Sequence, residues 1–275
     1  MKFSTSILFA VFVVVVALLP AAKAVPVGPT KILLIGKQPD HPWGTHMYLH
    51  TCGILAKCLQ LTERVETVVA DLWPTNEDDL DHVKTIVVYT SSAAEILLDG
   101  PYRNEFAQLM KQGVGLVTIH WASSVQEKNF ERLGPRWMSY LGGTWISNVG
   151  YTTSTSSLDQ LDASHPICRG WSSYELHDEF YLHPVLGENA KPLLQVHAND
   201  QPVVVGWAYE RENGGRAYGT TLGHYYQNFQ KEAFRRTLVN AILWTAHREV
   251  PKEGAPVDLD EADLKLPPKP EKKAK

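Results

Sequence analysis

Histidines stand at the ends of three predicted strands of this chain, where their ring nitrogens could bind a metal or move protons. His120 directly follows the apolar segment GLVTI, and His224 follows the strand-like segment RAYGTTLG. The loop after the first apolar strand carries two more, His41 and His46. One histidine at the end of a strand is more often a hydrogen-bonded structural residue. Three strand ends that each supply one indicate a shared site in a sheet crevice.

The segment HDEF adds carboxylates to these imidazoles. If it is extended, His177 and Glu179 share one face and Asp178 points away. Neutral imidazoles with one carboxylate and an open position are the ligand set of a catalytic zinc site. The same groups without a metal form a general acid–base set. HDEF as a solvated loop is a further interpretation, and the residue types leave these alternatives open.

His46 has a predicted place in the first turn of a helix. The spacing of apolar residues over 46–61 indicates a helix, and Thr45 is a favoured N-cap residue type. The positive end of the helix dipole disfavours an imidazolium there. We therefore expect a neutral imidazole that is suited to act as a base or as a metal ligand.

Aromatic side chains gather near the same loops. Trp43, Trp121 and Tyr225 stand close to the candidate histidines in the sequence. Flat rings beside a polar crevice suit the apolar faces of sugars, although large aromatic residues also commonly fill a core. Together with His41, these residues form the candidate substrate-binding set, and a small carbohydrate is the expected ligand.

The elements that must position these residues alternate between strands and helices. Apolar runs typical of buried strands occupy residues 31–36, 65–70, 85–90 and 114–120, and helices are expected over 46–61 and 101–112. This order is typical of a three-layer, doubly wound α/β fold with a mostly parallel sheet, as in flavodoxin. Ligands of such sheets bind beyond the carboxyl ends of the strands.

The second half of the chain predicts a β-hairpin added to that sheet. Strand-like segments at 202–209 and 216–223 flank a polar turn that ends in Asn-Gly-Gly. A helix is expected over 229–247. We expect one α/β domain over residues 25–250, followed by a Pro- and charge-rich disordered tail over 251–275.

The N-terminus has the pattern of a cleaved secretory signal over residues 1–24. Lys2 precedes the apolar run Ile7–Leu19, and Ala22-Lys23-Ala24 is an A-x-A cleavage pattern. As a helix the run is about 20 Å long, shorter than the roughly 30 Å hydrocarbon core of a bilayer. We expect cleavage after Ala24 and a secreted or periplasmic protein that is not integral to a membrane. An uncleaved anchor is the alternative.

Charge and missing motifs exclude several classes of function. The net charge of −4, with no Lys/Arg cluster in the body of the chain, argues against nucleic acid as a partner. The sequence has no Walker A motif, no GxGxxG after the first strand and no GxSxG elbow, so we expect no nucleotide cofactor and no serine hydrolase. Cys52, Cys58 and Cys168 lack metal-site spacing and are expected to be small core residues.

These motifs together resemble the trehalose-utilisation (ThuA-like) family. The resemblance covers roughly residues 30–250 and rests on GKQPDHPWGTHMY, GVGLVTIHWA, SHPICRGW, ELHDEFYLHP, GGRAYGTTLGHYYQNF and RRTLVNAILWTA. It implies a class I glutamine-amidotransferase-like α/β fold. It also implies a role in sugar metabolism, including trehalose and 3-keto sugar derivatives.

The resemblance extends to the candidate site. It implies polar site positions at His120, Glu179 and His224, with His41 and His46 from the first loop, and a metal at this cluster in some members. The amidotransferases of this fold use a nucleophilic cysteine, whereas His120 stands in about that place here. Glutamine hydrolysis through a thiolate is therefore excluded on chemical grounds.

The leading hypothesis is an exported, metal-assisted enzyme that acts on a sugar, glycoside or keto sugar as a hydrolase, lyase or isomerase. Its candidate catalytic residues are His46, His120, His177 and Glu179, with His46 or His177 moving protons. A divalent metal, zinc by preference, would be held by His120, Glu179 and His224. The alternatives are a non-catalytic carbohydrate-binding protein and a metal-free, histidine-based isomerase or lyase. A homo-oligomer is also compatible with the sequence.

Overall fold

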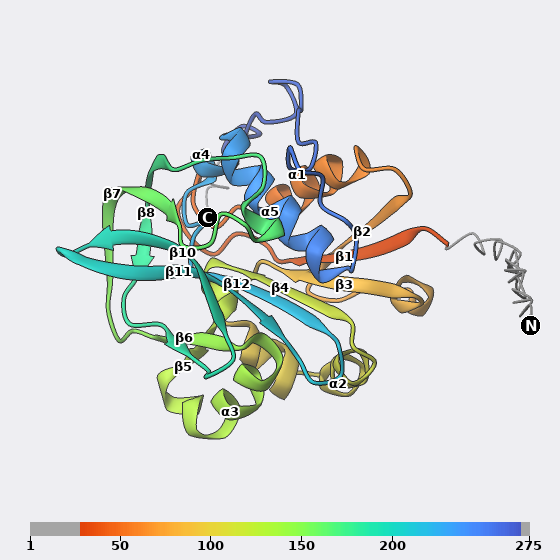
Figure 1. The fold of residues 1–275 in the computed structure, drawn as a ribbon. Helices are drawn as coiled ribbons and strands as arrows, with labels where there is room; N and C mark the ends of the chain where they lie inside the picture. The colour runs from red at the N-terminus through yellow and green to blue at the C-terminus, as the bar shows by residue number, and fades with distance from the viewer. Residues whose placement is uncertain (1–27, 271–275) are drawn as a thin grey trace, which may run out of the picture.

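One mixed sheet dominates residues 28–270, the part of the chain that this computed structural model describes (Figure 1). Its strand order is β2-β1-β3-β4-β12-β11-β10-β7-β8. These strands are β1 (Thr30–Gly36), β2 (Val65–Asp71), β3 (Val83–Val88), β4 (Gly115–Ile119), β7 (Tyr151–Gln160), β8 (Tyr174–Tyr181), β10 (Lys191–Ala198), β11 (Gln201–Glu210) and β12 (Arg216–Thr220). A smaller sheet joins β5 (Ser124–Gln126), β6 (Gly143–Ser147) and β9 (Val185–Leu186). The predicted signal segment, residues 1–24, lies outside the described residues.

Helices cover both faces of the main sheet. The helices are α1 (Tyr48–Gln60), α2 (Arg103–Lys111), α3 (Phe130–Leu141), α4 (Tyr226–Phe229) and α5 (Glu232–Thr245). α1 and α5 lie on one face, and α2 and α3 lie on the other (Figure 1). Within residues 28–270, none of the helices is long and apolar enough to cross a membrane.

The inner parallel strands β1, β3 and β4 are largely buried on both sides because their side chains alternate between two hydrophobic cores. In β1, Ile32 and Leu34 belong to the core under α1 and α5, whereas Leu33 and Ile35 belong to the core over α2 and α3. This is the two-residue period of a strand. It explains why the parallel strands are continuous apolar runs in the sequence, and the predicted three-layer α/β fold is confirmed.

The predicted hairpin forms, and it lies inside the sheet. β11 and β12 pair antiparallel, and β12 pairs parallel with β4. The hairpin thereby joins a parallel half, β2-β1-β3-β4-β12, to an antiparallel half made of β11, β10, β7 and β8. As a consequence, the carboxyl end of β12 lies at the same sheet edge as those of β1 and β4.

Strand β8 contains the HDEF segment, which is therefore no solvated loop. Its pairing with β7 places Glu179 opposite Thr153 and His177 opposite Thr155. Asp178 is fully buried, whereas His177 is exposed and Glu179 is half-buried. Since strand side chains alternate, His177 and Glu179 share one face, as the sequence predicted for an extended segment.

Helix α1 begins at Tyr48, later than predicted. Met47 is its N-cap residue and makes no side-chain cap bond, while the Thr45 hydroxyl donates to the Pro42 carbonyl (2.6 Å). His46 has a φ of 49°, in the left-handed region, and precedes the helix. The predicted Thr45 cap is therefore wrong, because the backbone reverses at His46 before the helix starts.

The predicted disordered tail is wrong for its first part. Ala255 and Val257 are fully buried in the core that α1 and α5 cover. The Val257 carbonyl accepts hydrogen bonds from the Arg235 guanidinium of α5. A few apolar residues among the prolines and charges thus attach this segment to the domain, whereas residues 271–275 lie outside the described part of the chain.

The cysteines are buried free thiols, in agreement with the sequence analysis. Burial raises the pKa of Cys52 to about 12, of Cys58 to about 11 and of Cys168 to about 12. Because the thiolate is the reactive form, these residues are chemically quiet core side chains.

His165 makes the packing against α5 sensitive to acid. Its Nδ1 accepts a hydrogen bond from the Ile167 N–H (3.3 Å), and its ring lies 5.0 Å from the Trp244 ring. Burial, and then the charge of Lys191, lowers its pKa from 6.5 to about 4. The unfolded chain therefore takes up this proton at a higher pH than the folded chain. Its contribution to stability is lost as the pH falls from 6.5 towards 4.

We expect His165→Asn to remove this part of the acid sensitivity. Asparagine keeps an acceptor atom for the Ile167 N–H but does not titrate. Urea unfolding of both proteins at neutral pH and at about pH 5 measures the effect. The contributions of titratable groups that both proteins share cancel in the difference between their free energies of unfolding. An equal loss of stability in the two proteins on acidification would contradict the assignment.

Candidate functional site

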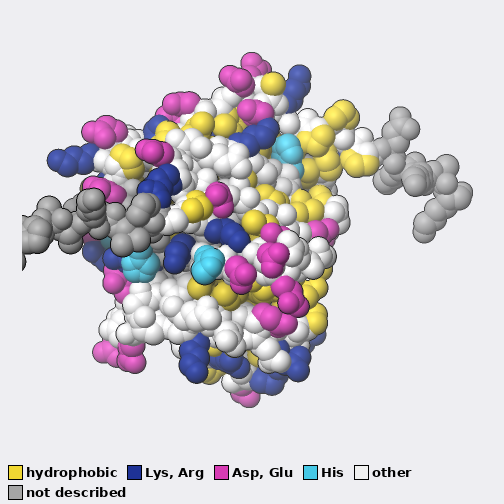
Figure 2. All heavy atoms as spheres, turned by 90° about the vertical axis from the view of Figure 1, so that its right-hand side faces the viewer, with side chains coloured by type: hydrophobic (Ala, Val, Ile, Leu, Met, Phe, Trp, Pro, Cys, Tyr) yellow, Lys and Arg dark blue, Asp and Glu magenta, His cyan; other side chains and the backbone are white. Residues whose placement is uncertain are grey.

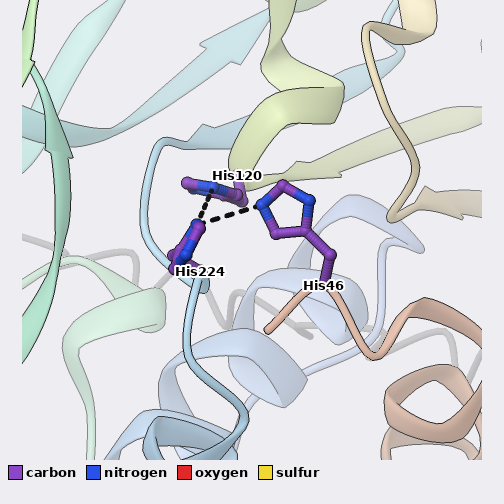
Figure 3. Close-up of side chains that lie close together, drawn as sticks. All are labelled: His46, His120 and His224. Carbon is purple, nitrogen blue, oxygen red and sulfur yellow. Dashed lines mark hydrogen bonds between the residues drawn. The ribbon is translucent and has the colours of Figure 1, made fainter. Parts of the chain in front are cut away.

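Three histidines from three loops meet at the carboxyl edge of the parallel strands (Figure 3). His46 lies in the loop after β1, His120 directly follows β4, and His224 follows β12. The distance from His224 Nδ1 is 3.0 Å to His46 Nε2 and 3.3 Å to His120 Nε2. All three side chains are buried. The structure thus brings together three strand-end histidines that are far apart in the sequence.

Left-handed backbone turns direct these side chains to one point. φ is 49° at His46 and 55° at His120, values that are uncommon for residues other than glycine and that cluster at functional sites. At His120 the chain passes sharply from β4 into the short helix η3 (His120–Ser123). Gly223, with a φ of 114°, provides the corresponding turn before His224.

Hydrogen bonds on the outer side of the cluster determine which ring nitrogens face inward. His120 Nδ1 donates to the Thr221 carbonyl (2.8 Å), because a carbonyl oxygen can only accept. His46 Nδ1 donates to the Tyr48 hydroxyl (2.8 Å), which in turn donates to Asp40 Oδ1 (3.1 Å), and it lies 3.2 Å from that carboxylate oxygen itself. With the protons on these Nδ1 atoms, the Nε2 lone pairs of His46 and His120 both face His224 Nδ1.

The three imidazoles are held in the neutral form. Burial, followed by the charges of His41 and His224, lowers the pKa of His46 to about 3. Burial, followed by His46 and His224, lowers the pKa of His120 well below 6.5. Burial, followed by His41, lowers the pKa of His224 to about 4. His46 is neutral as predicted, but burial and not a helix dipole is the cause.

Asp40 is the ionised group behind His46. Burial alone would raise the pKa of Asp40, but hydrogen bonds from Lys37, His41 and His46 and the charge of Lys37 lower it. A carboxylate that accepts the outer N–H of an imidazole orients the ring in many metal sites. Asp40 was not among the predicted residues, although its place directly before His41 is the signal that could have found it.

Strand β8 supplies a carboxylate and a phenol to the cluster. Glu179 Oε1 lies 3.8 Å from His120 Nε2 and 3.6 Å from His224 Nδ1, and burial raises the pKa of Glu179. The Tyr181 hydroxyl donates to His120 Nε2 (2.9 Å), and its ring stacks on Trp145 at 3.8 Å. Glu179 therefore lies beside the two histidines with which the sequence analysis grouped it, and Tyr181 is an addition.

Asp178 fixes the loop that carries His224. Its fully buried carboxylate accepts backbone N–H bonds from Gly223 (2.6 Å), His224 (3.0 Å) and Tyr225 (3.4 Å). Burial raises the pKa of Asp178 to about 7, against the opposing effect of these hydrogen bonds. Asp178 does point away from Glu179, as predicted, and for that reason it reaches beneath the loop.

Three of the predicted substrate-binding residues border the cluster. The ring of exposed His41 lies 3.8 Å from that of His46, and the half-buried Trp121 ring lies 5.9 Å from the same histidine. The half-buried Tyr225 ring lies 4.6 Å from that of His224. These side chains place one imidazole and two aromatic rings next to the histidines.

Two other predicted residues lie outside this group. His177 Nδ1 is hydrogen-bonded to the Thr155 hydroxyl (2.9 Å), and its ring stacks on Tyr225 at 5.4 Å. Trp43 packs against the hydrophobic core. The structure thus gives His177 no contact with the histidine cluster, and Trp43 follows the alternative that large aromatic residues fill the core.

A separate hollow lies at the amino-terminal edge of the sheet. It measures ≈ 1240 Å³, and its lining includes Val83, Val114, Asn213 and His247. On this side of the molecule, acidic and basic side chains are interspersed (Figure 2). We place the candidate site at the histidine cluster despite this hollow, because the converging ring nitrogens and perturbed pKa values lie there.

Asp178→Asn tests how the His224 loop is held. The NH₂ group of an asparagine side chain cannot accept the backbone N–H bonds that the carboxylate accepts now. We therefore expect a loss of about 1–3 kcal/mol in the free energy of unfolding. Asp159→Asn on β7 is the matched control, because the Asp159 carboxylate accepts a hydrogen bond from the Ser157 hydroxyl near the surface. Urea unfolding compares the two variants, and an equal, small effect of both would contradict the role of Asp178.

Comparisons with known proteins agree with this fold. A ThuA-like protein from Bacteroides uniformis superimposes with a TM-score of 0.63 at 18% identity, over 86% of this chain and 99% of that chain. A glutamine amidotransferase from Thermotoga maritima has a TM-score of 0.50 at 10% identity, over 79% and 98%. At such identities the likeness is one of fold, and no match is found among curated proteins.

The family model for ThuA, described as trehalose utilisation, matches residues 32–245. This chain therefore belongs to the trehalose-utilisation (ThuA) family, which supports a carbohydrate-related role.

Proposed function

We propose that the histidine cluster binds a divalent metal, zinc by preference, and that the chain is an exported, metal-assisted enzyme acting on a sugar, glycoside or keto sugar. The observation that supports this most strongly is the spacing of the three ring nitrogens, 3.0 and 3.3 Å. Ligand atoms of a tetrahedral zinc, each about 2.0–2.1 Å from the ion, lie about 3.3 Å from one another. His46 would thus join His120 and His224 as a ligand.

The chemistry of the donors also fits a metal. Neutral imidazoles are preferred zinc ligands, and the low pKa of each ring keeps it unprotonated at pH 7. The Tyr48 hydroxyl and the Thr221 carbonyl accept the outer N–H groups of His46 and His120, an arrangement that strengthens and orients imidazole ligands. Glu179, 3.6 Å from His224 Nδ1, is the adjacent carboxylate.

The residues around the cluster suit a reaction on a sugar. A divalent ion held there would supply Lewis-acid chemistry, polarising a carbonyl oxygen or activating water. Glu179 is half-buried and has a raised pKa, so it can take a proton from a bound sugar or return one to it. The Trp121 and Tyr225 rings offer apolar faces on which a sugar ring can stack.

One observation favours a metal-free, histidine-based isomerase or lyase as the second candidate. The Tyr181 hydroxyl donates to His120 Nε2, and a proton on His224 Nδ1 would satisfy His46 Nε2. The hydrogen-bond network therefore closes without an ion. Under this alternative, a neutral imidazole of the cluster acts as the base, and turnover survives exhaustive treatment with EDTA.

Zinc binding to the purified protein tests the metal. Added Zn²⁺ at 100 times its Kd should raise the free energy of unfolding by about 2.7 kcal/mol, and EDTA should reverse the gain. His46→Ala, His120→Ala and His224→Ala should each lose most of the affinity. Asp40→Asn should lower it about 10- to 100-fold through the orientation of His46. Calorimetric titration and thermal melting measure both effects.

The matched controls for these variants are His197→Ala and Asp200→Asn, which alter an exposed histidine and an exposed carboxylate elsewhere. Both should bind zinc like the unaltered chain. If the three cluster variants bind zinc as tightly as His197→Ala does, the metal site is wrong.

Glu179→Gln tests the catalytic part of the proposal. Glutamine keeps the size of the side chain but cannot transfer a proton, so kcat should fall about 10²- to 10⁴-fold while zinc affinity changes little. The measurement is consumption of 3-keto-trehalose followed by NMR, with the exposed Glu188→Gln as control. Tight binding of the sugar without turnover by the unaltered chain would favour a carbohydrate-binding protein instead.

A further inference from the structure

The Tyr181 hydroxyl is a buried donor whose acceptor is one of the nitrogens proposed to bind the metal. It donates to His120 Nε2 (2.9 Å), and Tyr181 is 3% exposed. Nδ1 of the same imidazole donates to the Thr221 carbonyl, so Nε2 has a single lone pair to offer. A lone pair that accepts the phenolic proton cannot bind a cation at the same time. The hydrogen bond from Tyr181 and a metal at His120 therefore exclude each other.

Aromatic contacts fix the Tyr181 ring at the cluster. The ring stacks on that of Trp145 at 3.8 Å, with 13° between the planes, and on that of His120 at 4.6 Å, with 26°. Trp145 is itself held, because its Nε1 donates to the Leu182 carbonyl (3.0 Å). Rings packed in this way cannot move far without opening a void, whereas a hydroxyl proton rotates about the C–O bond without any movement of the ring. The donor therefore stays at the cluster when its present acceptor is lost.

Loss of that acceptor leaves a buried O–H group to be satisfied. Among residues 28–270, the structure gives the Tyr181 hydroxyl no hydrogen bond besides the one to His120. A buried donor without a partner is unfavourable, so a new acceptor beside it is bound more tightly.

The candidate proton carrier of the site borders the same nitrogen. Glu179 Oε1 lies 3.8 Å from His120 Nε2, and Glu179 and Tyr181 share one face of β8 because they are two residues apart. A substrate oxygen that reaches this part of the cluster meets a carboxylate and a phenol together. The phenol can hydrogen-bond the oxygen on which negative charge develops while the carboxylate transfers the proton.

We propose that the Tyr181 hydroxyl is a substrate-binding donor that His120 occupies in the metal-free protein. It donates to the reacting oxygen of the substrate once the lone pair of His120 Nε2 is engaged by a metal. This inference rests on the proposed function, because it needs a metal at His120. Tyr181 then has two opposite effects: it weakens metal binding, and it strengthens the interaction with the substrate.

Zinc affinity of Tyr181→Phe tests the release of the hydroxyl. Phenylalanine keeps the stacked ring but removes the donor, so zinc binding no longer has to break a hydrogen bond. The Kd for Zn²⁺ should fall roughly 2- to 12-fold, the effect of one hydrogen bond. Calorimetric titration of the full chain with Zn²⁺ measures it. A loss of packing alone would weaken zinc binding, so a gain is a result that a merely structural role of Tyr181 does not produce.

Tyr174→Phe is the matched control. Tyr174 lies on the same strand, and its buried hydroxyl has no hydrogen-bond partner within the described part of the chain. This variant should bind zinc like the unaltered chain.

Turnover at saturating Zn²⁺ tests donation to the substrate. Tyr181→Phe should lower kcat for 3-keto-trehalose roughly 10²- to 10³-fold, the effect of removing one donor at an oxygen on which charge develops. Tyr174→Phe should leave kcat unchanged. Consumption of the sugar is followed by NMR, and thermal melting in EDTA shows whether each variant is folded.

The outcomes separate this inference from the proposed function. Zinc binding by Tyr181→Phe that is no tighter than that of Tyr174→Phe would overturn the release of the hydroxyl. Tighter zinc binding with an unchanged kcat would overturn donation to the substrate. If the unaltered chain binds no zinc, the proposed metal site fails and the inference fails with it. If it binds zinc but consumes no 3-keto-trehalose, the proposed reaction and the donor role both fail, and the zinc titration still decides the release.

Discussion

The burial of neighbouring imidazoles is the constraint on which the rest of this structure depends. Ring nitrogens separated by 3.0 and 3.3 Å in a buried cluster cannot all be protonated, because each positive charge would lie next to another without water to screen it. The protein must therefore satisfy the outer nitrogens with acceptors and keep the inner ones free. Tyr48, which is bonded to Asp40, and the Thr221 carbonyl perform this task, and Asp178 holds the backbone from which His224 projects.

The fold is suited to this arrangement because its parallel strands end at one edge. β1, β4 and β12 each deliver a histidine there, and left-handed turns at His46, His120 and Gly223 direct the side chains inward. The sharp turn from β4 into η3 presents an imidazole at this edge, while the thiols of this chain are buried elsewhere.

Much of the fold and part of the site could be predicted from the sequence, and the limits have physical reasons. Apolar strands and amphipathic helices carry a periodic signal, so the three layers and the strand-end positions of His120 and His224 were predictable. Asp178 and Tyr181 were not, because a local pattern does not show that β8 folds back against the loop after β12. The packing of Ala255 and Val257 was also hidden, since two apolar residues leave the composition of a charged tail almost unchanged.

By itself the sequence determined the fold class, the family motifs and the places where imidazoles follow strands, because these depend on local periodicity and on residue type. Tertiary structure alone decided which atoms meet. It set His46 Nε2 against His224 Nδ1, assigned Asp40 and Asp178 to supporting roles and moved His177 to the neighbouring surface. These choices depend on distances between loops that are remote in the chain. Such distances follow from the pairing of β12 with β4 and of β7 with β8, which no local segment specifies.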